Sequence, residues 1–153
     1  MIFLKNYYIN TTAEIDFLVA THDIKYAVRD SQAKNGLVTV IVPGPGASVA
    51  LLEPVSGLID EFRAVFEAFG EGENKGKDKR GADVYLTPRV QAMMLGRTLS
   101  IPLKDGRLVM SPYDEIYLID FNKKAQRREY TVQIMSEDAK ETAPQARQPA
   151  KKK

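Results

Sequence analysis

The sequence contains no cysteine, no tryptophan and a single histidine among its 153 residues. The absence of cysteine excludes disulfide bonds, thiolate metal sites and a cysteine nucleophile. The histidine, His22, falls in the first turn of an expected helix, where an imidazole is typically a surface group rather than a ligand or base. The residues most often used for metal binding and proton transfer are therefore scarce.

Long apolar runs are also missing. No stretch approaches the ~20 residues that a membrane-spanning helix requires. The first six residues, MIFLKN, lack the basic start and the cleavage site of a signal peptide. We therefore expect a cytoplasmic protein without membrane contact.

The chain has little excess of either charge, with a formal net charge of +2. Residues 136–153 carry five basic and three acidic side chains, which leaves residues 1–135 with 17 of each and no net charge. Because residues 1–135 carry no net charge, we do not expect them to bind nucleic acid specifically. We predict one domain over residues 1–135, followed by a disordered tail over 136–153 that is rich in Lys, Pro, Gln and Ala.

Runs of apolar and β-branched residues predict seven or eight strands. The first two runs, 2–9 and 13–19, are expected to form an antiparallel pair. Asp105-Gly106 lies between two apolar runs and predicts a tight hairpin. Residues 115–121 have the content of a central strand. The remaining expected strands cover residues 37–42, 47–52 and 127–135.

Three helices are expected between these strands. The first has Thr21 as its N-cap and ends at Asn35-Gly36. The second begins at Pro54, carries an aromatic stripe typical of core packing, and ends at Gly70. A short third helix starts at Thr87-Pro88 and closes near Gly96, after a polar loop over 70–83 that is expected to be a mobile surface segment. The result is an α+β fold dominated by antiparallel sheet.

Pro43-Gly44-Pro45-Gly46 interrupts an apolar run. Such a sequence cannot occupy a regular central ladder. Its glycines would also let a phosphate approach the backbone, but the lysine and the spacing of a P-loop are missing. A structural bend is the favoured interpretation.

Several short motifs occur in a characteristic order: Asn35-Gly36-Leu37-Val38, Ala47-Ser48 with Glu53, and QAMMLG over 91–96, followed by SIPL over 100–103, DGRLV over 105–109 and IYL over 116–118. With this combination, residues 1–135 resemble the YjbQ family of small bacterial and archaeal proteins, often described as secondary thiamine-phosphate synthases. The resemblance implies a compact α+β fold and a homotrimer.

The chain departs from the family pattern at its polar positions. The family has a histidine where this chain has Gly44, another at Arg89, and a third in the loop before the short helix. The family's Gly-Thr-Trp-Gln signature is replaced by residues 111–114, and Glu53 is the family site residue that remains, with Ser48 beside it. A guanidinium repels cations and cannot act as a base. We therefore predict a degraded site with no metal and no cofactor.

Three functions remain open. The first is binding of a small phosphorylated or carboxylate ligand, for which the candidate residues are Gly44, Gly46, Ser48, Glu53, Arg89, Tyr113 and Asp114. At this site, Arg89 has a competing structural interpretation, an ion pair with Glu53 or Asp114. The second is a non-catalytic homotrimer. The third is an enzyme similar to thiamine-phosphate synthase, which the missing histidines disfavour.

Overall fold

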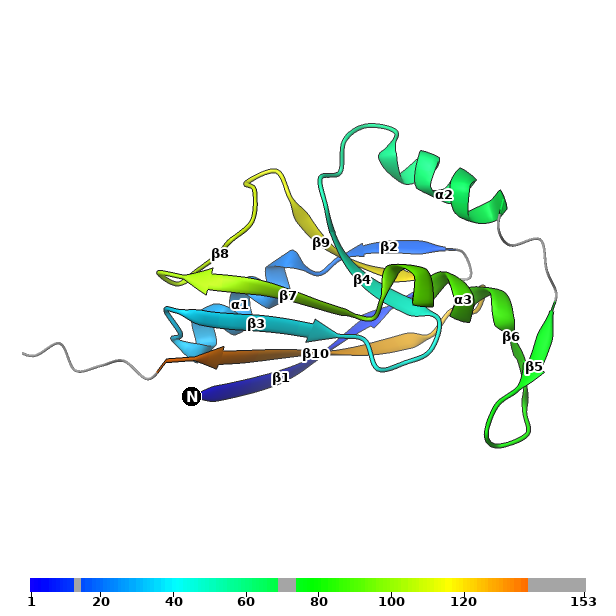
Figure 1. Ribbon diagram of the computed structural model, residues 1–153, viewed down its shortest axis with the longest axis horizontal. Helices are drawn as coiled ribbons and strands as arrows, with labels where there is room; N and C mark the ends of the chain where they lie inside the picture. The colour runs from blue at the N-terminus through cyan, green and yellow to red at the C-terminus, as the bar shows by residue number, and fades with distance from the viewer. Residues whose placement is uncertain (13–14, 69–73, 138–153) are drawn as a thin grey trace, which may run out of the picture.

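The computed structural model describes residues 1–12, 15–68 and 74–137 (Figure 1). Within these ranges the chain forms ten strands and three helices, and the fold is α+β as predicted. The strands are β1 (Ile2–Asn10), β2 (Asp16–Val19), β3 (Gly36–Ile41), β4 (Ala47–Leu52), β5 (Lys75–Lys77), β6 (Asp83–Tyr85), β7 (Thr98–Lys104), β8 (Arg107–Leu108), β9 (Glu115–Asp120) and β10 (Arg127–Ser136). The helices are α1 (Thr21–Ser31), α2 (Leu58–Ala68) and α3 (Leu86–Leu95).

The strands form three antiparallel sheets. The order is β1-β10-β3-β7-β8 in the largest sheet, β2-β9-β4 in the second, and β5-β6 in a small hairpin. The expected pairing of the first two runs is wrong, because β1 pairs with β10 and β2 pairs with β9. Thr11 explains the separation: its backbone N–H and its hydroxyl both donate to the carbonyl of Gln126, which holds the end of β1 beside the start of β10.

The two larger sheets enclose the core, and β9 is buried on both faces. Ile116 and Leu118 pack with the larger sheet and α1 in the main core. Tyr117 and Ile119 face the other way, into a second cluster beneath α2 and α3. The alternation places successive side chains of one strand in different cores. The prediction that residues 115–121 form a central strand is confirmed.

The ends of α1 differ from the sequence expectation. Ala20 is the N-cap, and the hydroxyl of Thr21 instead donates to the carboxylate of Glu115 and accepts the N–H of Ile116. The helix closes at Gln32, which adopts a left-handed conformation with φ 57°, four residues before Gly36. His22 is exposed, as predicted.

The second helix starts at Leu58 rather than Pro54, because Gly57 has a φ of +83° that no helix residue adopts. Its aromatic stripe packs as predicted, with the Phe62 and Phe66 rings stacked 4.1 Å apart between centroids. Its predicted end at Gly70 lies outside the described residues. The third helix ends at Gly96, as predicted.

Part of the predicted polar loop is ordered structure. Residues 75–85 contain the β5–β6 hairpin, whose turn is fixed by the carboxylate of Asp78 accepting two backbone N–H groups. Residues 70–73 of that loop and 138–153 of the predicted tail lie outside the described residues, while Ser136 belongs to β10. In the part of the chain that is described, no helix combines the length and apolar character needed to cross a bilayer.

A buried tyrosine makes the stability of this fold sensitive to alkaline pH. Tyr130 is fully buried and its hydroxyl donates to the carboxylate of Asp23 on α1. Burial, and then the hydrogen bond to Asp23, raise the pKa of Tyr130 above that of a free tyrosine. The neutral side chain of Tyr130 therefore contributes its full stabilisation at pH values below about 10, the pKa of tyrosine in the unfolded chain. As the pH rises above 10, the unfolded chain releases this proton while the folded protein keeps it, so the free energy of unfolding falls.

We therefore expect a smaller loss of stability above about pH 10 in Tyr130→Phe than in the wild type, with the two slopes differing by up to about 1.4 kcal/mol per pH unit. Urea unfolding at a series of pH values measures this difference. Equal slopes in the two proteins would show that Tyr130 ionises normally in the fold.

Candidate functional site

The Pro-Gly-Pro-Gly segment forms a corner between the two larger sheets. It joins the end of β3 to the start of β4, so that the predicted bend is confirmed as the point where the chain changes sheets. Gly46 has a φ of +78°, a conformation that favours glycine. The amide of Asn122 donates to the carbonyl of Pro45 and holds the corner against the end of β9 (3.1 Å).

A buried ion pair lies beneath this corner. The Nε of Arg128 donates to Oδ2 of Asp120 at 2.8 Å, and its Nη2 donates to Oδ1 at 3.2 Å. The side chains are 6% and 0% exposed. Asn122 also donates its backbone N–H and its amide to Oδ1 of Asp120. The carboxylate is thus fully hydrogen-bonded, which is the condition under which a buried charge is tolerated.

The guanidinium of Arg128 fills the space beside Gly44. Its Nη2 donates to the carbonyl of Pro45 at 2.7 Å. A Cβ placed on Gly44 would lie less than 3.0 Å from Nη1 of Arg128. Any side chain at position 44 would therefore have to displace the guanidinium of Arg128.

A second arginine holds the same corner. The Nε of Arg97 donates to the carbonyl of Val42 at 3.1 Å, and its Nη2 donates to the carbonyl of Pro43. Arg97 has no carboxylate partner among the described residues. Two guanidinium groups and one carboxylate thus surround the corner, which has a net positive charge.

Ser48 and Arg89 lie on elements that pack together. Ser48 is fully buried in β4 and its hydroxyl donates to the carbonyl of Ala92 on α3 at 3.0 Å. Arg89, one turn earlier on α3, is half-buried. Within the described ranges it forms no ion pair, so the pairing with Glu53 or Asp114 considered above does not occur.

The other candidate residues lie at the opposite end of β4. Ala47 pairs with Asp120, whereas Leu52 pairs with Glu115, so Glu53 follows the end of the strand beside the 111–114 segment. A strand of this length spans roughly 17–20 Å. Tyr113 is 72% exposed, and Asp114 accepts the backbone N–H of Ser111. One small ligand cannot contact both ends.

The candidates therefore form two groups. Gly44 and Gly46 lie at a cationic corner, with Ser48 on the strand that leaves it and Arg89 on the helix that packs against that strand. Glu53, Tyr113 and Asp114 lie at an acidic end. In the described residues, no three His, Asp or Glu side chains converge in a way that would hold a metal ion. The donor set at the corner also does not fit a divalent cation, because its charged groups are guanidinium ions that repel one.

The residues that shape the corner were not among the sequence candidates. Arg97, Asp120, Asn122 and Arg128 together hold it. Two sequence signals point to the buried pair. Asp120 ends an apolar run that is buried on both faces. Arg128 lies two positions before the inward-facing Tyr130 and therefore points to the same side of β10. A charge at either position requires a buried partner.

Comparison with known proteins identifies the family. The family model described as "UPF0047 protein YjbQ-like" matches residues 5–137. The chain belongs to the YjbQ family. This YjbQ protein is also 23% identical over 123 residues to a UPF0047 protein of Archaeoglobus fulgidus, covering 78% of this chain and 92% of that protein.

Solved structures give the same fold. A YbjQ-like protein of unknown function from Sulfolobus solfataricus matches with a TM-score of 0.79 and 23% identity, over 90% of this chain and 99% of that one. An uncharacterised YjbQ/UPF0047 protein from Clostridium acetobutylicum matches with a TM-score of 0.75 and 20% identity, over 86% and 99%. The fold class and the family resemblance derived from the motifs are therefore confirmed.

Proposed function

We propose that this YjbQ protein is a non-catalytic, cytoplasmic homotrimer that binds a small phosphorylated or carboxylate anion at the Gly44 corner. The observation that carries the proposal is the guanidinium of Arg128 in the space beside Gly44. Nη1 of Arg128 donates to no acceptor among the described residues, and a glycine at position 44 leaves it uncovered by a side chain. A planar, permanently charged donor of this kind suits phosphate and carboxylate oxygens.

Arg97 and Arg89 supply further positive charge. Arg97 lies against the same corner and has no carboxylate partner in the described part of the chain. Arg89 lies on α3, which packs against β4 through the Ser48–Ala92 hydrogen bond. Buried or half-buried cations without a carboxylate partner favour an anionic ligand over a cationic one. None of these groups can exchange a proton near neutral pH, which supports binding rather than catalysis.

Arg97→Gln is expected to weaken the binding of glycerol 3-phosphate at least fivefold, because it removes a positive charge next to the corner. Isothermal titration calorimetry measures the affinity. The matched control is Arg127→Gln, which removes the same charge from an exposed residue that stacks on Tyr8. Equal losses in the two variants, or no binding to the wild type, would contradict an anion site at this corner.

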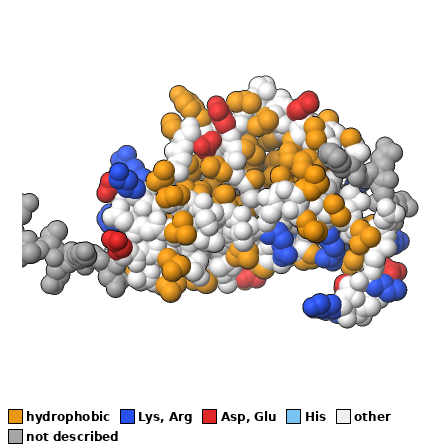
Figure 2. Space-filling view, in the orientation of Figure 1, with side chains coloured by type: hydrophobic (Ala, Val, Ile, Leu, Met, Phe, Trp, Pro, Cys, Tyr) orange, Lys and Arg blue, Asp and Glu red, His pale blue; other side chains and the backbone are white. Residues whose placement is uncertain are grey.

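Two exposed apolar surfaces support the homotrimer. On α3, Val90, Met93 and Met94 are 52%, 78% and 54% exposed, and Figure 2 shows hydrophobic side chains gathered over this side of the molecule. Ile2 and Leu4 of β1 are exposed on the outer face of the five-stranded sheet. A cyclic trimer uses a different patch on each side of every interface, so two separate apolar patches are what it needs.

If the trimer forms in this way, a charge on one patch alone is enough to dissociate it. Met93→Glu and Leu4→Lys are each expected to convert the protein to monomers in light scattering. The control is Lys123→Glu, an exposed substitution in the turn before β10, which is expected to leave the mass unchanged. A wild-type protein that is monomeric in light scattering would contradict the proposed homotrimer.

A further inference from the structure

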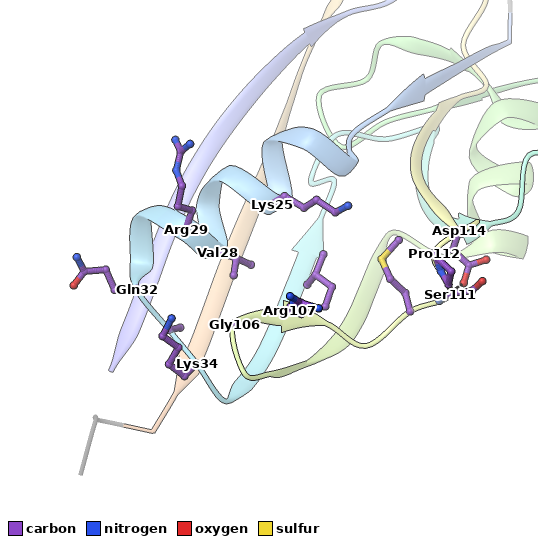
Figure 3. A pocket seen from close by; sticks show the side chains of 13 residues that line it. Lys25, Val28, Arg29, Gln32, Lys34, Gly106, Arg107, Ser111, Pro112 and Asp114 are labelled. Atoms are coloured by element: carbon purple, nitrogen blue, oxygen red, sulfur yellow. Dashed lines mark hydrogen bonds between the residues drawn. The ribbon is translucent and has the colours of Figure 1, made fainter. Parts of the chain in front are cut away.

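A groove that shares only Asp114 with the candidate residues lies between α1 and the β7–β8 hairpin. It has a volume of about 1060 Å³ and is closed on its third side by the 110–114 segment (Figure 3). Its floor is apolar: Val28 is buried, and the half-buried Leu108 and Met110 pack against the main core. This volume is slightly above the range of about 300–1,000 Å³ that is typical of small-molecule sites.

The walls of this groove carry an excess of positive charge. Lys25, Lys34 and Arg107 line it, and none of the three has an ion-pair partner in the described part of the chain. Asp114 is the one acidic residue of the lining, and its Oδ2 already accepts the backbone N–H of Ser111 at 2.9 Å. An apolar floor beneath several unpaired cations is complementary to an anion with an apolar body.

The helix dipole explains only part of this charge. The C-terminal end of α1 carries partial negative charge, which Lys34 and Arg29 complement. Arg29 is otherwise engaged: it lies 4.8 Å from the Tyr26 ring centroid and pairs with Asp30 at 3.6 Å, and Figure 3 shows it pointing away from the groove.

Lys25 and Arg107 are not explained by the dipole. Lys25 lies about two turns before the end of α1 and reaches toward the segment with Ser111 and Asp114, as Figure 3 shows. Arg107 comes from a different element, the hairpin whose turn is fixed by the positive φ values of Asp105 and Gly106. The hairpin is anchored to the loop that follows α1 by the N–H of Gly106, which donates to the carbonyl of Lys34 at 2.8 Å. Two exposed cations from separate elements thus line the same groove.

We propose that this groove binds a small organic phosphate, with the phosphate at Lys25 and Arg107 and an aromatic or branched apolar body against Val28, Leu108 and Met110. The site is separate from the Gly44 corner and does not rest on the function proposed for it. Lysine provides a point charge and arginine a forked donor for the phosphate oxygens. The apolar floor distinguishes an organic phosphate from inorganic phosphate.

Phenyl phosphate titrated into the full-length protein tests the site. Backbone amide signals in NMR spectra separate the two regions, because those of Val28, Leu108 and Met110 report on the groove and those of Gly44 and Gly46 report on the corner. The groove signals are expected to shift with saturation. Phenol and inorganic phosphate are each expected to require at least tenfold higher concentrations at the groove, since one lacks the charge and the other lacks the apolar contact.

A double variant identifies the cations. Lys25→Gln/Arg107→Gln is expected to weaken phenyl phosphate binding at the groove at least tenfold, while the concentration dependence of the Gly44 and Gly46 signals stays unchanged. Lys79→Gln/Arg80→Gln is the matched control, because it removes one lysine and one arginine from the exposed turn of the β5–β6 hairpin. All four side chains are exposed, so both variants are expected to fold.

Three results would overturn the inference. The first is the absence of saturable shifts at the groove. The second is an equal loss of affinity in the two double variants, which would indicate attraction by general charge alone. The third is inorganic phosphate binding at the groove as tightly as phenyl phosphate, which would show that the apolar floor does not contribute to the affinity.

Discussion

Asp120→Ala is expected to lower the free energy of unfolding by about 3–5 kcal/mol, because it leaves the guanidinium of Arg128 buried without its counter-ion. The same substitution removes the acceptor of two hydrogen bonds from Asn122. The corner between the two sheets thereby loses the anchor of its contacts with Asn122, which follows β9, and with Arg128 on β10. Urea unfolding followed by circular dichroism measures the effect, at one fixed protein concentration so that assembly does not enter the comparison.

The control for Asp120→Ala is Asp83→Ala. Asp83 pairs with Lys77 at 2.8 Å on the β5–β6 hairpin, but both side chains are more than 60% exposed, at 65% and 68%. Exposed pairs of this kind are worth about 0–1 kcal/mol. Similar losses in the two variants would show that the Asp120–Arg128 pair is solvated and contributes little. A double variant, Asp120→Leu/Arg128→Met, is expected to recover much of the stability, since it removes both buried charges together.

Gly44→Ala is expected to cost about 1–3 kcal/mol, the range typical of overpacking. The added methyl group would contact Nη1 of Arg128, and the arginine cannot move freely because Asp120 and the carbonyl of Pro45 hold it. The φ of Gly44 is outside the left-handed region, so backbone strain does not contribute. Gly44→His, which introduces the residue that the family resemblance implies for this position, is expected to change stability in the same direction.

A double-mutant cycle tests whether the cost of Gly44→Ala arises from its contact with Arg128. In an Arg128→Met background the same substitution is expected to cost less, since the shorter, uncharged side chain can yield. Urea unfolding of the four proteins gives the coupling energy. A cost for Gly44→Ala that is identical in both backgrounds would show that the guanidinium does not restrict position 44.

Local sequence signals predicted where helices, strands and turns occur better than they predicted which strands pair. Asp105-Gly106 gave a hairpin and Gly96 gave a helix end, since both depend on backbone conformations that few other residues adopt. The pairing of β1 with β10 joins residues that are 117 (Asn10 and Arg127) to 133 (Ile2 and Met135) positions apart, and no local pattern contains that information. The late start of α2 also escaped prediction, because Pro54 is acceptable at a helix start and Gly57 is decisive only once its φ is known.

The candidate site was predictable in part. The motifs located Gly44 and Arg89 as positions where the chain departs from the pattern that the family resemblance implies, but Arg97 and Arg128, which make the corner cationic, were not among the candidates. What could not be read was that Arg128, rather than Arg89, occupies the space beside Gly44. Nor could the sequence show that Glu53 and Asp114 lie at the far end of β4, because that separation is set by the register of β4 on β9.

The position of β10 between β1 and β3 has a consequence for the order of folding during synthesis. This strand, which pairs with β1 on one side and β3 on the other, is the last of the described strands to leave the ribosome. Until it emerges, β1 has no neighbour with which to form a ladder, and the edge of β3 stays open. The nascent chain must therefore keep two apolar strands apart for most of its translation, and closure of the sheet is governed by the slow search typical of contacts distant in sequence.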